Sequence, residues 1–195
     1  LKFGIVSKID PKESVLCASV TTMTISSDGT PGATEWEYSS SNKTLTYGTN
    51  VASSNSAHTT FFDGVELEVN DRVLIKNASH NGVGGTSEAA DANGIYYCSS
   101  KGDGSNPVVL TRATDHNTTG STGNVSAGNF VFIEGGSTLA DSGFVMQKYS
   151  SWTNTNWPDA ISGNGTAANT ITWTQFSSNG TSSSAADDIT TGDAA

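Results

Sequence analysis

Apolar residues occur along this chain in short segments that alternate with polar residues or are cut by turn dipeptides such as Asp-Gly and Asn-Gly. Alternation with a period of two places successive side chains on opposite faces of a β-strand. We find no extended segment with the 3.6-residue period of an amphipathic helix. The pattern predicts strands within residues 21–25, 36–38, 44–47, 65–69, 73–75, 95–97, 108–110, 130–133, 144–146 and 171–176.

Two neighbouring segments carry more specific expectations. Val65, Leu67 and Val69 alternate with glutamates and predict a half-buried strand over 65–69. The continuous apolar run at 73–75 predicts a strand that is covered on both faces. Between this run and the next predicted strand, the glycine-rich residues 77–93 predict a long loop.

The last segment shows the same two-residue period. Ile171 and Trp173 share one face of the predicted strand, and Phe176 lies on the other. With turn residues spacing all of these segments, we expect an all-β fold: an antiparallel β-sandwich or open β-barrel with long polar loops and little or no helix.

Composition and charge narrow the classes of partner. The 195 residues carry a net charge of −10, and only nine are Lys or Arg. Nucleic-acid binding depends on basic side chains that neutralise phosphates, so we expect no nucleic-acid partner. No apolar stretch approaches the length of a transmembrane helix, so we expect no membrane insertion.

The sequence gives little support for catalysis. His58, His80 and His116 are far apart in polar turns and are expected to be exposed, without a metal or a catalytic partner. Glu66 and Glu68 share a strand face that reads as solvated, whereas a glycosidase needs two acids across a cleft. We therefore expect no enzymatic activity and no cofactor.

The two cysteines, Cys17 and Cys98, lie in different local contexts. They are expected to be small, half-buried residues, as free cysteines commonly are. A disulfide between them is an alternative that the sequence leaves open.

One aromatic segment is a candidate contact site. Trp152, Asn154, Asn156 and Trp157 combine aromatic rings with amides, a pairing that can stack on sugars and hydrogen-bond to them, or contact a protein. The alternative is a loop that packs on the core or on a neighbouring subunit. A glycan on a host surface is the ligand that this segment suggests.

Five blocks along the chain are similar, in the same order, to a β-rich module of phage tail-fibre, head-fibre and related virion surface proteins. The first block resembles Asp-Gly-Val-x-Leu followed by Asp-Arg-Val-Leu-x-Lys, and the second reads Asn-Gly-Ile-Tyr. The matching residues are Asp63, Gly64, Val65, Leu67, Asp71, Arg72, Val73, Leu74 and Lys76; Asn93, Gly94, Ile95 and Tyr96; Arg112, Ala113 and Asp115; Gly128, Val131, Phe132, Gly135, Asp141 and Gly143; and Trp173, Gln175 and Phe176. The chain departs from the family pattern at Asn70, where Gly is preferred, and at Leu110 and Phe144, where Trp is usual.

The resemblance implies a domain organisation. Residues 1–60 would form an N-terminal β segment, either an arm or extra strands; residues 61–176 would form the module; and residues 177–195 would form a flexible or partner-ordered tail. Insertions at 77–91, 99–107 and 149–168 would lengthen loops. Within the module, Gly64, Gly94 and Gly143 are expected to supply turn geometry, and Asp71 to cap a turn.

The matched charged residues are expected to fix the architecture. Arg72 and Arg112 are candidates to pair with one of four acids. The acids are Asp63, Asp71, Asp115 and Asp141.

The resemblance also implies a function. It favours a structural phage virion protein at the virion surface, either a tail fibre, an appendage or a capsid-decorating subunit. Its partners would be other virion proteins and further copies of itself, with a trimer as one arrangement, and inserted loops could adhere to the host surface. The alternatives are a cellular surface filament or S-layer-like subunit, which would be extracellular, and a carbohydrate-binding module.

Overall fold

The computed structural model describes residues 10–25, 35–39, 41–47, 60–80, 92–102, 106–117, 124–148 and 171–178. Within these ranges the chain forms short strands and a single turn of 3-10 helix, η1 (Thr114–His116), without any α-helix. The predicted all-β fold is therefore confirmed. No helix of bilayer-spanning length and apolarity occurs in this part of the chain.

The larger sheet has eight strands in the order β2-β8-β10-β11-β5-β4-β3-β9. Their bounds are β2 (Cys17–Ala18), β3 (Met23–Ile25), β4 (Trp36–Ser39), β5 (Thr44–Tyr47), β8 (Arg72–Ile75), β9 (Ala78–His80), β10 (Gly94–Lys101) and β11 (Val108–Arg112). The run from β8 through β10, β11 and β5 to β4 is antiparallel throughout. The β4–β5 pair matches the two strands predicted within 36–38 and 44–47, which form an antiparallel hairpin.

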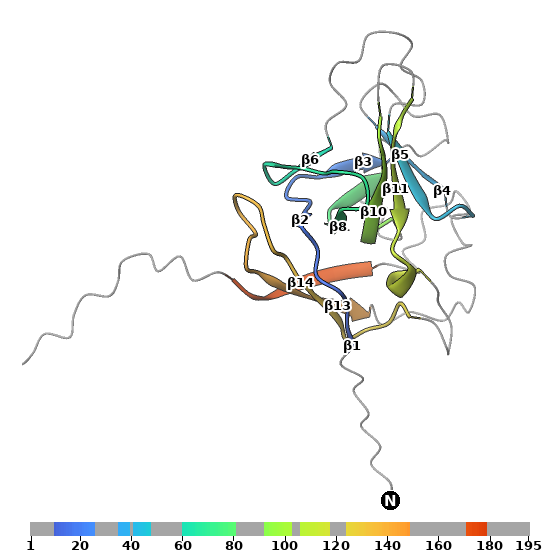
Figure 1. The fold of residues 1–195 in the computed structure, drawn as a ribbon. Coiled ribbons are helices and arrows are strands. Elements are labelled where there is room, and N and C mark those ends of the chain that lie inside the picture. Colours follow the sequence, from blue (N-terminus) through green and yellow to red (C-terminus); the bar gives the residue numbers. More distant parts are fainter. Residues whose placement is uncertain are drawn as a thin grey trace, which may run out of the picture.

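The smaller sheet has four strands in the order β1-β12-β13-β14 and lies below the larger sheet in Figure 1. Its strands are β1 (Asp10–Pro11), β12 (Asn129–Phe132), β13 (Gly143–Lys148) and β14 (Ile171–Ser177). A separate hairpin joins β6 (Phe61–Phe62) to β7 (Val65–Glu66). The described strands thus form a curled larger sheet with a second sheet packed beneath it.

Strand β8 links two hydrophobic cores. Val73 and Ile75 lie in the core that the larger sheet encloses, whereas Leu74 lies in the core between the two sheets. All four residues of β8 are buried, which confirms the prediction from the continuous apolar run. Burying each such aliphatic side chain contributes about 1.5–3 kcal/mol, so β8 stabilises both cores at once.

The N-terminal strands pair in parallel with strands far along the chain. β1 pairs with β12, β2 with β8, and β3 with β9, and Val15 forms a parallel bridge to Ile133. Parallel pairing needs a long connection between partners, which the intervening chain supplies here. Residues 10–25 therefore run along both sheets, and they share the cores with strands from the 61–176 region.

The predicted strand over 65–69 is wrong beyond its first two residues. β7 ends at Glu66, and Val69 is 50% exposed. Asn70 has φ +80°, a left-handed conformation that Asn tolerates better than most residues. The Asp71 amide donates to the Glu68 carbonyl (3.0 Å), and the Asp71 carboxylate accepts from the Glu68 amide (2.7 Å). Asp71 thus caps this turn, as expected, and the turn ends the strand.

The predicted loop at 77–93 is wrong for residues 78–80, which form β9. This strand is short and polar, so it lacks the apolar alternation that predicts strands. Its position follows from pairing with β3, in which Met23 lies opposite Ala78. Similarly, part of the expected insertion at 99–107 continues β10 as far as Lys101.

Candidate functional site

The candidate contact residues Trp152, Asn154, Asn156 and Trp157 lie outside the described residues. Their role in binding therefore stays a prediction. So does the expectation for the tail, of which only residues 177–178 are described.

Asp63 anchors the loop that follows β12. The residue is only 7% exposed. Its carboxylate accepts hydrogen bonds from the amides of Thr138 (3.0 and 3.1 Å) and Leu139 (2.8 Å), and its carbonyl accepts from the Ser137 amide (2.8 Å). A Cβ on Gly136 would approach the carboxylate to 2.3 Å, so the loop needs glycine there. Asp63 was a candidate partner for an arginine, but these bonds hold it on backbone amides.

Arg72 fastens the N-terminal segment to the larger sheet. Its guanidinium binds the Asp115 carboxylate, with a shortest distance of 2.9 Å, and donates to the Tyr97 hydroxyl at 2.8 Å. It also donates to the carbonyls of Glu13 and Ser14, both at 3.1 Å. Burial opposes its charge, but Asp115 and Tyr97 more than offset this cost and raise the pKa of Arg72. The predicted Arg72–Asp115 pairing is confirmed.

A second buried polar group connects the two sheets. Arg112, 2% exposed, donates to the Asn93 carbonyl (3.0 Å) and the Tyr38 hydroxyl (3.2 Å) and lies over the Tyr96 ring. The Asn93 side chain accepts from the Ala78 amide (2.9 Å) in the larger sheet. It also donates to the Ile171 carbonyl (3.0 Å) in the smaller sheet. These residues of the module-like blocks therefore position backbone segments.

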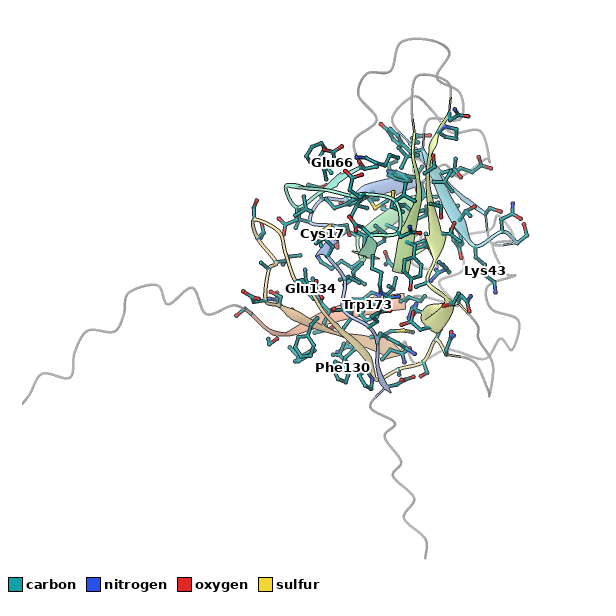
Figure 2. The ribbon with its side chains drawn as sticks, in the orientation of Figure 1. Cys17, Lys43, Glu66, Phe130, Glu134 and Trp173 are labelled. Carbon is teal, nitrogen blue, oxygen red and sulfur yellow. The ribbon has the colours of Figure 1, made fainter. Side chains whose placement is uncertain are left out.

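His116 is fully buried, so the expectation of an exposed histidine is wrong for this residue. Its ring lies 5.5 Å from the ring of Trp173, a side chain that Figure 2 shows between the two sheets. Burial, then the charges of Arg112 and Lys12, lowers the pKa of His116 well below its usual value of 6.5. Neither ring nitrogen has a hydrogen-bond partner among the described residues. The side chain of His80 and the whole of His58 lie outside the described part.

Both glutamates are exposed, as predicted, but they do not share a strand face, because β7 ends at Glu66 and Glu68 lies in the turn that follows. Lys101 on β10 binds both carboxylates, Glu66 at 3.0 Å and Glu68 at 2.7 Å, and the two acids are 49% and 71% exposed. Because both acids share one lysine on an open surface, they do not form the cleft that acid-base hydrolysis of a glycoside needs.

Both cysteines are free and fully buried in the core that the larger sheet encloses. Burial, then the charges of Asp63 and Asp71, raises the pKa of Cys17 to about 12. Burial also raises the pKa of Cys98. A thiol that stays protonated is a poor nucleophile, so these residues fill the core.

A shallow groove of about 210 Å³ lies between residues 19–24 and the β6 hairpin. Its lining residues include Thr21, Thr22 and Thr24 together with the aromatic residues Trp36, Tyr47 and Phe61. Phe61 is 53% exposed, and the Trp36 and Tyr47 rings lie 5.1 Å apart. The sequence reasoning missed this groove, because its lining residues come from segments that are separated in the sequence.

Three phenylalanines form an exposed cluster on the outer face of the smaller sheet, where Figure 2 labels Phe130. The rings of Phe130, Phe132 and Phe176 make mutual edge-on contacts, with centroids 5.8–6.0 Å apart. Phe132 is 48% and Phe176 is 51% exposed. The sequence held a signal for this cluster, since Phe130 and Phe132 lie two apart on one strand and so share a face.

Comparison with models of protein families, with curated proteins and with solved structures finds no match to this chain. Among the described residues, no group of three or more His, Cys, Asp or Glu side chains could hold a metal ion. What these residues do contain is a set of buried polar anchors, an open groove and an exposed aromatic face.

Proposed function

We propose that this protein is a structural subunit of a phage virion, either a tail fibre, an appendage or a capsid-decorating protein, which acts by assembling into an oligomer. Its surface would contact other virion proteins and further copies of itself. It would carry out no catalysis and need no cofactor.

The observation that carries this proposal is the role of the polar residues in the module-like blocks. Asp63, Arg72, Asn93 and Arg112 are all nearly buried, and each binds backbone atoms of another segment. Buried polar groups that are hydrogen-bonded to backbone atoms in this way hold loops and strands in place. The blocks that resemble the phage module thus specify a scaffold, which is what an assembly subunit requires.

Particle labelling tests this function. An antibody raised against the chain, applied to particles from the source and viewed by electron microscopy, is expected to label virions at fixed positions, with pre-immune serum as the control. Unlabelled particles, together with a chain recovered only as a free protein, would contradict the proposal. Labelled cell-surface filaments would support the alternative of a cellular surface subunit.

The groove beside Phe61 favours a second function, adhesion to a host-surface glycan. Aromatic rings next to hydroxyl groups suit sugars, which present apolar faces for stacking and polar edges for hydrogen bonds. A glycan array probed with the wild type, Phe61→Ala and Trp157→Ala is the test. Loss of binding in one variant locates the contact in the groove or in the 152–157 segment, and an array without any bound glycan contradicts adhesion to sugars.

A further inference from the structure

We propose that the outer face of the smaller sheet is a self-association surface, on which the Phe130, Phe132 and Phe176 cluster packs against the same face of a second copy of this chain. The inference rests on the proposed function, because it names the surface through which the oligomer would form. It follows from the order, charge and position of this face.

The cluster is held in place before any partner arrives. A register shift between Gly143 and Phe144 brings Phe176 over Gly143, where a Cβ would approach the Phe176 ring to 2.4 Å. Phe132 lies opposite Gly143 on the other side, and the three rings contact one another. Aromatic side chains that are already ordered lose little conformational freedom on binding.

The described outward-facing positions of β12, β13 and β14 carry no charge, and the exposed Glu134 follows two residues after Phe132, at the end of this surface. Alternation with the buried residues of β12, β13 and β14 sets the outward-facing described positions. They are Phe130, Phe132, Val145, Gln147, Thr172, Thr174 and Phe176. The centres of protein interfaces are likewise rich in aromatic residues and depleted of charge.

The absence of charge at the outward-facing positions of these three strands indicates the kind of partner. The whole chain carries a net charge of −10, so two copies repel each other wherever acidic surfaces meet. An uncharged face lets identical copies approach, and one patch packed on itself gives a closed, two-fold contact. A basic partner would instead gain most by binding the acidic surfaces elsewhere.

The exposed apolar area of the cluster sets the expected strength of self-association. Phe132 and Phe176 are each about half exposed, so together they offer roughly 200 Å² of apolar surface, against about 800 Å² that each partner buries in a stable complex. The cluster would therefore be the centre of the contact, with the threonines and Gln147 at its rim. We expect association of the purified protein that depends on concentration.

Sedimentation equilibrium over a wide concentration range tests the surface. The wild type is expected to associate, and added salt should leave association unchanged or strengthen it, because salt screens the repulsion between acidic copies. The variant Phe132→Ser with Phe176→Ser should weaken association at least tenfold. Val69→Ser is the matched control, because Val69 is equally exposed but lies in the turn between β7 and β8, and it should associate like the wild type.

A second variant keeps the test independent of folding. Thr174→Glu places a negative charge at an exposed rim position of the face and leaves the three phenylalanines in place. It should melt like the wild type and still lose association. A wild type that is monomeric at all concentrations overturns the proposal, as does association that survives both variants. Association that appears only when residues 1–9 are deleted would show that this segment covers the face, and would also overturn it.

Failure here can be told apart from failure of the proposed function. A chain that labels virions but does not associate through this face overturns the surface alone. A chain that associates through Phe132 and Phe176 but labels no particle overturns the virion role alone.

Discussion

Replacing Asp63 should expose how much the module-like blocks contribute to the fold. In Asp63→Ala, the buried Leu139 amide loses its acceptor, which costs about 1–3 kcal/mol, and the partly buried Thr138 amide loses another, at about 1 kcal/mol. Asp63 also has φ +50°, where alanine is disfavoured by about 1 kcal/mol relative to aspartate. The free energy of unfolding should therefore fall by about 3–5 kcal/mol.

A matched control separates the hydrogen bonds from the backbone term. Asp141 has φ +60° but is exposed, so Asp141→Ala should cost only about 1 kcal/mol. Asp63→Asn keeps an acceptor oxygen and tolerates the left-handed backbone, and it should cost about 1–2 kcal/mol. Urea unfolding followed by tryptophan fluorescence measures all three. If Asp63→Ala and Asp141→Ala lower the free energy of unfolding by the same amount within about 0.5 kcal/mol, the Asp63 carboxylate does not anchor the loop.

Three further outcomes are expected. Burial lowers the pKa of His116, so the folded protein binds fewer protons than the unfolded chain below pH 6.5. The contribution of His116 to the free energy of unfolding should therefore be constant above that pH. As the pH decreases from 6.5 to 5, it should lower the free energy of unfolding by up to about 1.4 kcal/mol per pH unit. Urea midpoints of His116→Phe should lack this part of the slope, and equal slopes would argue against a buried neutral imidazole. Gly143→Ala should destabilise the fold by about 1–3 kcal/mol through overpacking against Phe176, and thermal melts should show part of this loss relieved by Phe176→Ala; strict additivity would contradict the close contact. Cys17 and Cys98 should resist a thiol reagent until the protein unfolds, and rapid labelling of the native protein would refute their burial.

The apolar pattern predicted the central strands because the order of apolar and polar residues within each strand matches which of its side chains are buried. The continuous run in β8 indicated cover on both faces, and both cores meet there. Ile171 and Trp173 alternate in β14, and both are buried while Phe176 is exposed. Where a segment's environment follows from its own period, sequence reasoning suffices.

The rest depends on partners that are distant in the sequence. β9 is polar and forms because β3 lies beside it, and no local pattern marks that pairing. His116 sits in a polar turn and is buried by Trp173 from another sheet. The exposed phenylalanine cluster likewise forms only because β12 and β14 pair with opposite edges of β13. The candidate segment around Trp157 stays a prediction from composition.

The parallel pairings of the N-terminal strands have a consequence for biosynthesis. Asp10 and Asn129 are 119 positions apart and share a hydrogen bond between their side chains. Strand β2 likewise can pair only after β8 has been synthesised. Residues 10–18 can therefore complete their sheets only after the chain as far as β12 has emerged from the ribosome. Contacts of such long range slow folding to milliseconds or longer, and the early segments present unpaired strand edges to other nascent chains throughout that interval.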